Sequence, residues 1–424
     1  MSLIKEPIMT QSFDLIVIGV GMAAVTAANK CASAGWSVAV VDELPYGGTC
    51  ALRGCDPKKM LRRGAEIIDA ASLMNGKGIE PGSLAINWSD LMAFKRAFTE
   101  KMPPKIESGL DKNGVTTLHG SAKFIAENII EVDGKTRLQA KKILFVGGGF
   151  ISFEFAHIAA RAGSDVQIID RGERPLKGFD PDLVDKLLER SKEAGIEVVK
   201  KTSLISIAKE GSGYSVTLDV DGNIQEYSAD LIVHGAGRVP AIDDLDPDKA
   251  GVESDAHGVK VNEYLQSISN PSIYAAGDAA DTKGAPLTPV AVFEGKAVAS
   301  NMLKGNHAKP DYKGVPIVVF TIPELARVGM LEEEAKTAGY KLRIATNDTS
   351  GWYSNLRVGE TCAATKVIID DETGKILGAH LLGPEYAEII NFFGLAMRLD
   401  LTTSELKKMV SAYPSVGSDV GSML

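Results

Sequence analysis

Apolar and polar residues in the N-terminal part of the chain follow the order of a strand, a turn, a helix and a second strand. Residues 13–43, FDLIVIGVGMAAVTAANKCASAGWSVAVVDE, begin with a short apolar run, as a buried strand does. A glycine-rich turn follows, then an amphipathic helix ending at Gly35, then a strand that closes on Asp42. This order predicts a complete βαβ unit.

The same order returns at residues 142–171, KILFVGGGFISFEFAHIAARAGSDVQIIDR, and predicts a second nucleotide-binding half. Between the halves, residues 58–112 have a helical pattern and 115–140 the pattern of short strands. Strands are also expected at 196–233. The pattern changes over 311–424 to strands and amphipathic helices, which is typical of a separate α+β domain.

The joint between the two halves is unusual. RLQAKKILFVGGG, residues 137–149, passes from the first half into the second through a single strand. Each half should have a strand of its own before the glycine turn. Either the natural chain lacks a connector here, or residues are missing from this sequence, and we keep both hypotheses.

Length and charge narrow the class of protein. A chain of 424 residues predicts two to four domains. Its net charge of −9 is spread without a basic block, which argues against nucleic acid or an anionic membrane as a partner. The longest apolar stretch, residues 15–28, is shorter than the ~20 residues that a membrane span needs. With no secretory signal evident, a cytoplasmic location is expected.

The first glycine turn has the pattern of a dinucleotide site. Gly19 and Gly21 allow a tight turn and a close approach to a pyrophosphate, and Ala24 is small enough for the helix to pack on the strand. Asp42, at the tip of the second strand, is placed to bind a ribose hydroxyl. The alternative is a turn without a ligand, with Asp42 as a helix cap.

The second turn, Gly147-x-Gly149-x-x-Ser152, ends in serine, and Asp170 stands at its ribose position. Three cations follow closely: Arg171, Arg174 and Lys177. A carboxylate favours the 2′-hydroxyl of NADH, whereas cations favour the 2′-phosphate of NADPH. The sequence therefore leaves the choice of nicotinamide open, and a solvated charged loop also explains the cations.

Two of the four cysteines, Cys50 and Cys55, stand close together in GGTCALRGCDP, residues 47–57. A zinc site would need four ligands, and the six histidines are scattered, so no metal site is predicted. A redox-active dithiol is the preferred interpretation, because a helix N-terminus and a lysine such as Lys58 can lower the pKa of a thiol. The other two cysteines, interpreted as small core residues, are Cys31 and Cys362.

Two nucleotide folds and this dithiol resemble the FAD-dependent pyridine nucleotide-disulfide oxidoreductases, the family of glutathione reductase, dihydrolipoamide dehydrogenase and mercuric reductase. GGTCALRGCDPKK is similar to the redox-active signature of the family, GAGRVP to its ATGRxPN loop and YAAGDAA to its second FAD motif. The resemblance implies an α/β fold with two Rossmann-like domains and a C-terminal α+β dimerisation domain. The implied boundaries are 10–142 and 248–310 for the split FAD-binding domain, 143–247 for the NAD(P)-binding domain and 311–424 for the interface domain.

The resemblance also implies roles for single residues. Cys55 would face the flavin and Cys50 would meet the substrate, while Lys58 would lie beside flavin N5 and pair with Glu154. The FAD contacts implied are Gly19, Gly21, Ala24, Asp42, Gly48, Thr49, Lys59, Ala122, Gly277, Asp278 and Ala291. The NAD(P) contacts implied are Gly147, Gly149, Phe150, Asp170, Arg171, Lys177 and Gly237, with the Phe150 ring as a gate over the nicotinamide pocket.

The C-terminus departs from the family pattern. Where the family has His-Pro-Thr and then Glu, this chain has AYPSVGSDVGSML, so Tyr413 takes the place of the histidine. A phenol holds its proton near pH 7, whereas an imidazole exchanges one. Tyr413 is therefore expected either to orient a substrate or to serve only as an aromatic residue of the dimer interface.

Three functions are consistent with these residues and with the family resemblance. The first is a homodimeric flavoprotein disulfide oxidoreductase that passes electrons from NADH or NADPH through FAD to Cys50 and Cys55, and then to a small thiol-disulfide acceptor. The second is a diaphorase-like enzyme that reduces quinones, metal ions or oxygen. The third is a non-catalytic nucleotide-binding redox sensor.

Overall fold

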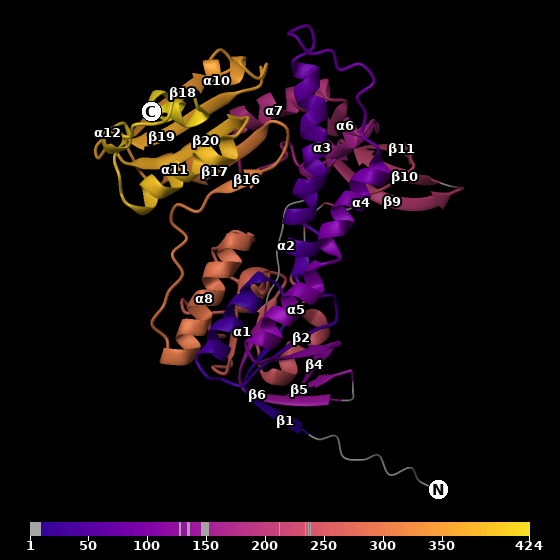
Figure 1. The fold of residues 1–424 in the computed structure, drawn as a ribbon, viewed down its shortest axis with the longest axis vertical. Coiled ribbons are helices and arrows are strands. Elements are labelled where there is room, and N and C mark those ends of the chain that lie inside the picture. Colours follow the sequence, from indigo (N-terminus) through magenta and orange to yellow (C-terminus); the bar gives the residue numbers. More distant parts are fainter. Residues whose placement is uncertain are drawn as a thin grey trace. The chain divides into compact units, whose positions relative to one another are not determined.

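The computed structural model describes residues 10–126, 129–133, 136–145, 152–211, 213–233, 235, 237 and 239–424, with only the backbone described for 137–145. The chain forms two compact units (Figure 1). The first comprises Met1–Met60, Met92–Gly149 and Gly237–Tyr312, and the second comprises Leu61–Leu91, Phe150–Ala236 and Lys313–Leu424. The predicted domain boundaries stay a prediction.

The first unit is built on a seven-stranded sheet of order β3-β2-β1-β6-β5-β4, with β14 also paired to β6. Its strands are β1 (Thr10–Ile18), β2 (Val38–Asp42), β3 (Val115–His119), β4 (Ala122–Ala126), β5 (Ile129–Val132), β6 (Thr136–Phe145) and β14 (Ile273–Ala275). β1 is parallel to both β2 and β6. The βαβ unit predicted for residues 13–43 is confirmed.

Small residues bring two helices of this unit together. α1 (Met22–Ser33) and α8 (Thr288–Lys304) lie side by side (Figure 1). A Cβ added at Gly295 of α8 would lie 2.6 Å from the carbonyl oxygen of Ala23, so only glycine allows this approach. The apolar run of β1 is correspondingly buried, with Leu15 to Val17 fully shielded from solvent.

The helical pattern predicted between the two halves is confirmed. It contains α3 (Cys55–Leu73), α4 (Trp88–Thr99) and α5 (Met102–Lys112), preceded by the short α2 (Gly48–Leu52). α3 begins in the first unit and ends in the second. The shorter elements of the first unit are η1 (Asp243–Leu245), η2 (Pro247–Ala250), β12 (Ser254–Asp255), β13 (Gly258–Lys260), η3 (Gly277–Ala279) and β15 (Ala280–Asp281).

The second unit contains the remainder of the repeated motif. Its elements are α6 (Ser152–Arg161), β7 (Val166–Ile169), α7 (Pro181–Glu193) and β8 (Ile196–Val199), followed by the antiparallel strands β9 (Thr202–Glu210), β10 (Gly213–Val220) and β11 (Asn223–Ala229). β7 and β8 form a two-stranded parallel sheet.

The strand before the second glycine turn does not join this sheet. Residues 143–145 belong to β6 and pair with β14, and 142–144 pair with β1. The strands expected up to residue 233 were wrong at the end, because β11 ends at Ala229 and residues 231–233 are irregular. Among the described residues, no strand lies beside Leu231 and Val233, whose side chains are 75% and 63% exposed.

The C-terminal part of the second unit is a five-stranded antiparallel sheet of order β16-β17-β20-β19-β18 with helices packed on it. The strands are β16 (Ile317–Val319), β17 (Glu324–Gly329), β18 (Leu342–Asp348), β19 (Ala364–Asp370) and β20 (Ile376–Gly383). The helices are α9 (Glu332–Thr337), α10 (Tyr353–Leu356), α11 (Tyr386–Arg398), α12 (Thr403–Leu406) and η4 (Val416–Met423). The predicted mixture of strands and amphipathic helices is confirmed.

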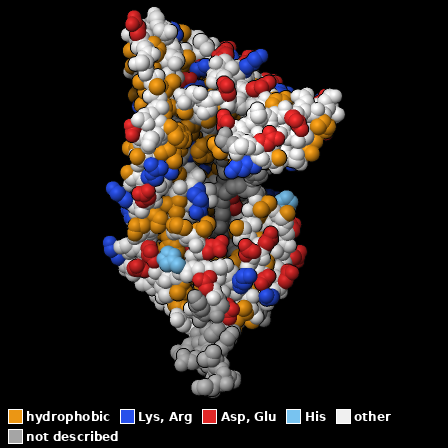
Figure 2. Space-filling model, turned by 90° about the vertical axis from the view of Figure 1, so that its right-hand side faces the viewer, with side chains coloured by type: hydrophobic (Ala, Val, Ile, Leu, Met, Phe, Trp, Pro, Cys, Tyr) orange, Lys and Arg blue, Asp and Glu red, His pale blue; other side chains and the backbone are white. Residues whose placement is uncertain are grey.

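Charges of both signs are mixed on one face of the molecule. Figure 2 shows acidic and basic side chains interspersed on the face in view. In the described part of the chain, no helix is both long and apolar enough to span a membrane. The cytoplasmic location stays a prediction.

Candidate functional site

The first glycine turn forms a cradle for a pyrophosphate. Gly19 has a φ of +82°, and Gly21 begins α1 without a side chain to cap the helix. The first amides of α1 can therefore bind an anion. A Cβ added at Gly48 would lie 2.8 Å from Cα of Gly21, so the segment before the cysteines presses directly on this turn. The turn and the helix N-terminus fit the FAD that the sequence predicts.

Asp42 supports the turn from the end of β2. Its carboxylate accepts the N–H of Val20 at 2.7 Å and the N–H of Leu44 at 2.9 Å. The residue is only partly buried. The ribose contact predicted for Asp42 stays a prediction, and the backbone bonds show that the carboxylate also orders the turn.

The two cysteines lie on consecutive helices. Cys50 is in α2, and Cys55 is the first residue of α3. Both are free thiols and partly buried. The Cys55 sulfur lies 3.4 Å from the hydroxyl oxygen of Thr288, in the first turn of α8. The sequence analysis did not single out Thr288.

The surroundings of the two thiols give them different pKa values. A hydrogen bond from Cys50, with smaller contributions from Thr288 and the charge of Lys58, lowers the pKa of Cys55 to about 6. The hydrogen bond with Cys55 and burial raise the pKa of Cys50. The reduced pair therefore holds a thiolate at Cys55 and a thiol at Cys50 near pH 7.

Lys58 and Glu154 are both buried, with exposures of 7% and 2%. Lys58 lies one turn after Cys55 on α3, and Glu154 lies in the first turn of α6. The N–H of Phe320 donates to Oε1 of Glu154 at 2.8 Å. Since Lys58 and Glu154 belong to different units, their pairing stays a prediction.

A second turn of the first unit is held by a buried carboxylate that sequence analysis missed. Glu294 is fully buried and accepts the N–H of Gly277 at 2.6 Å and the hydroxyl of Tyr312 at 2.7 Å. Burial raises the pKa of Glu294. This network orders the turn that carries Asp278, which the sequence assigned to FAD.

The other residues assigned to FAD differ in exposure. Lys59 is exposed and Thr49 is partly buried. Ala24, Ala122 and Ala291 are buried small residues of the core. For these residues, flavin contact stays a prediction. Among the described residues, no group of three or more His, Cys, Asp or Glu side chains is placed to hold a metal ion.

The nicotinamide residues are only partly described. Gly147, Gly149 and Phe150 lie outside the described residues. Asp170 follows β7 and accepts the N–H of Gly172 at 2.6 Å. Three other residues assigned to this site are exposed: Arg171, Lys177 and Gly237. Their binding role stays a prediction.

Tyr413 stands on the surface of the second unit, with 80% of its side chain exposed. Val410 is 96% exposed. Asp419, next to the position where the family has glutamate, accepts a hydrogen bond from the Ser354 hydroxyl. This carboxylate therefore holds the C-terminal segment to α10.

Comparison with known proteins defines the class. The family model described as pyridine nucleotide-disulphide oxidoreductase matches residues 13–145 and 130–295, and the dimerisation domain of the same family matches 315–423. The chain belongs to this family. It is an FAD-dependent, NAD(P)H-using flavoprotein disulfide oxidoreductase, as the sequence predicted.

Among its relatives, the glutathione reductase of Nostoc sp. is 30% identical over 463 aligned residues, covering 98% of this chain and all of that protein. A mercuric reductase of Lysinibacillus sphaericus is 28% identical and covers 95% of this chain and 80% of that protein. An uncharacterised 19.7 kDa protein in a mercuric resistance operon of Staphylococcus aureus is 50% identical over 177 residues, 42% of this chain and 98% of that protein.

The fold also matches a solved structure. The Cu(II) complex of the HOCl-induced flavoprotein disulfide reductase RclA from Escherichia coli superposes with a TM-score of 0.86 at 24% identity, over 97% of this chain and 99% of that chain. At this identity, the match supports the shared fold. The predicted α/β class with two Rossmann-like domains and a dimerisation domain is confirmed.

The comparisons also bear on the joint between the halves. The two family matches overlap at 130–145, so β6 is matched both as the end of the first half and as the beginning of the second. The alignment to the Nostoc protein is longer than this chain, and therefore includes positions where this chain has no residue. The Nostoc protein therefore has residues that this chain lacks, and both hypotheses for the joint stay predictions.

Proposed function

We propose that the chain reduces a small thiol-disulfide acceptor through Cys50 and Cys55. The observation that carries the proposal is a pair of free, partly buried thiols on the consecutive helices α2 and α3, with the Cys55 sulfur 3.4 Å from the Thr288 hydroxyl oxygen. These surroundings lower the pKa of Cys55 and raise that of Cys50. When bound, FAD supplies the two-electron transfer that restores this pair from its disulfide. The remaining steps belong to side chains of the protein.

In the oxidative half of the proposed cycle, the Cys50 sulfur attacks the disulfide of the acceptor and its proton passes to the departing sulfur. That sulfur leaves as a thiol, and a mixed disulfide with Cys50 remains. The Cys55 thiolate then attacks the Cys50 sulfur, which releases the second half of the acceptor as a thiolate. The Cys50–Cys55 disulfide forms, so the acceptor gains two electrons and the pair loses two.

Two further parts of the proposal concern Lys58 and Tyr413. Lys58 and Glu154 are proposed to lie beside the flavin, which is supported by their burial and by the position of Lys58 on the helix of Cys55.

Tyr413 is proposed to belong to a homodimer interface. The matched dimerisation domain supports this, as does a set of exposed apolar side chains: Leu395, Leu399, Val410 and Tyr413.

The second candidate function is reduction of metal ions or quinones. It is favoured by the 50% identity to a protein from a mercuric resistance operon, and by tyrosine in place of the family histidine. A metal ion or quinone needs no general acid to release a thiol. In this case, the dithiol would store electrons instead of exchanging disulfides.

A steady-state panel separates the two functions. Glutathione disulfide, lipoamide, a quinone and Hg²⁺ are offered with NADH and with NADPH to the wild type and to Cys50→Ser. The first proposal predicts that a disulfide is reduced by the wild type and not by Cys50→Ser. It is overturned if quinones turn over equally in both proteins and no disulfide turns over in either.

A further inference from the structure

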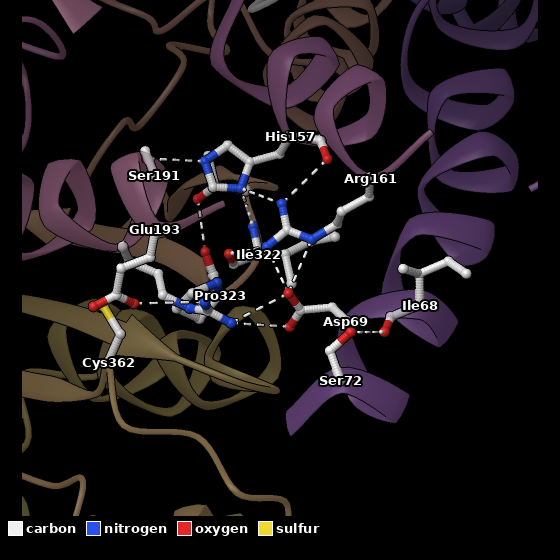
Figure 3. Close-up of polar contacts among 12 residues, drawn as sticks. Ile68, Asp69, Ser72, His157, Arg161, Ser191, Glu193, Ile322, Pro323 and Cys362 are labelled. Atoms are coloured by element: carbon white, nitrogen blue, oxygen red, sulfur yellow. Dashed lines mark hydrogen bonds and ion pairs between the residues drawn. The ribbon is translucent and has the colours of Figure 1, made fainter. Parts of the chain in front are cut away.

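The segment 320–322, between β16 and β17, is held by side chains from two helices of the second unit. It lies within the matched dimerisation domain. The Arg62 side chain of α3 donates to two of its carbonyl oxygens, and side chains of α6 accept two of its amides. Arg161 of α6 also donates to the carbonyl of Ile322 at 3.1 Å. Figure 3 shows part of this arrangement, with His157 and Arg161 from α6 around Ile322.

On the α3 side, the contact is made by Arg62. Its Nε donates to the carbonyl of Phe320 at 3.0 Å, and its Nη2 donates to the carbonyl of Thr321 at 2.9 Å. The residue is 8% exposed, and its charge is balanced by ion pairs with Glu66 and Glu324. A buried, paired guanidinium with two fixed acceptors has little freedom to move.

On the α6 side, the contacts are made by Glu154 and His157. Glu154 accepts the N–H of Phe320 at 2.8 Å, and Nδ1 of His157 accepts the N–H of Ile322 at 3.2 Å. Burial and the charge of Arg161 lower the pKa of His157, so its ring is neutral and can accept at Nδ1. Phe320 is thus held at its N–H by Glu154 and at its carbonyl by Arg62.

A direct ion pair also joins the two helices. Nη2 of Arg161 on α6 lies 2.7 Å from the Asp69 carboxylate on α3 (Figure 3). Nη2 of Arg190 lies 3.2 Å from the same carboxylate. Asp69 is 8% exposed. α3 and α6 are therefore joined both through segment 320–322 and directly.

We propose that Arg62 is a positioning residue for Glu154, acting through the backbone of Phe320. Lys58 and Arg62 stand at helical spacing on α3, the helix that begins at Cys55. The proposal rests on the proposed role of Glu154 beside the flavin.

The test compares the visible flavin spectrum and the rate of flavin reduction by the nicotinamide in four holoenzymes: wild type, Glu154→Gln, Arg62→Met and Arg62→Lys. Arg62→Met is expected to shift the flavin absorption bands in the same direction as Glu154→Gln and to slow flavin reduction roughly tenfold. Arg62→Lys can reach only one of the two carbonyls and is expected to give a smaller shift of the same sign. In the double variant, Arg62→Met should add nothing to Glu154→Gln.

A matched control separates positioning from stability. Lys366 is 5% exposed and pairs with the buried Asp180 at 2.9 Å in the same unit. Lys366→Met therefore also breaks a buried ion pair, and it should lower the unfolding temperature without moving the flavin bands. Equal band shifts in Lys366→Met and Arg62→Met overturn the proposal, as does an unchanged spectrum in Arg62→Met when Glu154→Gln shifts. An unchanged spectrum in Glu154→Gln overturns both this proposal and the role of Glu154.

Discussion

The two glycine turns are similar in sequence, but they differ in the sheets that lead into them. β1 precedes the first turn and lies between β2 and β6 in a sheet of seven strands. The strand before the second turn is β6 itself, paired with β1, β5 and β14. A strand can pair at its two edges only, so β6 is not available to β7. A repeated motif therefore does not guarantee a repeated sheet.

Amide hydrogen exchange is expected to show the largest contrast between the halves. Leu15, Ile16 and Val17 of β1 are fully buried, whereas Val166, Ile168 and Ile169 of β7 are only partly buried. Local opening should therefore cost less in β7, and its amides should exchange roughly 100-fold to 1000-fold faster than those of β1. Equal protection in the two strands would show that the second sheet is completed in solution.

Sequence patterns predicted the first half well because its strands and helix are local and strongly periodic. The run of apolar residues in β1 and the alanine face of α1 need no distant partner to be recognised. The strand expected at residues 231–233 failed for the opposite reason. Its formation depends on a neighbouring strand, which no local pattern reveals.

Gly48→Ala should weaken flavin binding in the first half and leave nicotinamide binding to the second unchanged. The new Cβ would lie 2.8 Å from Cα of Gly21, at a φ of +59°. Displacing the turn to relieve this clash should cost about 1–3 kcal/mol. The dissociation constant of the flavin, measured by fluorescence, should therefore rise roughly 10-fold to 100-fold. Gly35→Ala is the control, because Gly35 also has a positive φ of +90° but has nothing within 4 Å. A similar loss of flavin affinity in both variants would show that backbone strain at a positive φ, and not the close approach to Gly21, is responsible.

Asp170→Ala tests the second half in the same way. Loss of the carboxylate should lower the ratio of kcat/KM for NADH to kcat/KM for NADPH about tenfold, the effect of one charge-assisted hydrogen bond. Asp170→Asn keeps an acceptor for the N–H of Gly172, which lies 2.6 Å from the carboxylate. If Asp170→Ala leaves the ratio unchanged while flavin binding is normal, the ribose assignment of Asp170 is wrong.

Thr288→Val should give the smallest change, in the ionisation of Cys55. Because the pKa of Cys55 is lowered to about 6, its thiolate predominates above that pH and is protonated as the pH falls through it. Removing one hydroxyl donor should raise this pKa by about one unit. The pH dependence of iodoacetamide alkylation of the reduced protein measures the shift. Thr282→Val, which removes a hydroxyl that bonds Glu294, should not move it.

The two redox cysteines were easier to predict than the residues that surround them. Cys50 and Cys55 stand five positions apart in a recognisable signature, so the sequence alone identified them. Thr288 and Glu294 come from a helix more than 200 positions further along the chain, and their contacts with Cys55 and Gly277 exist only in the folded chain. The link from Arg62 to segment 320–322 was missed because it is made to backbone carbonyls, which carry no sequence signal.

The proposed function requires Cys50 and Cys55 to hold the electrons destined for the acceptor. An anaerobic titration of the oxidised holoenzyme with dithionite tests it most directly, with thiols counted after denaturation at each step. We expect the first two electrons per chain to produce two new thiols and a long-wavelength thiolate-to-flavin charge-transfer band, and we expect Cys55→Ser to show no such band. Bleaching of the flavin by the first two electrons with no new thiols, or survival of the band in Cys55→Ser, would contradict it.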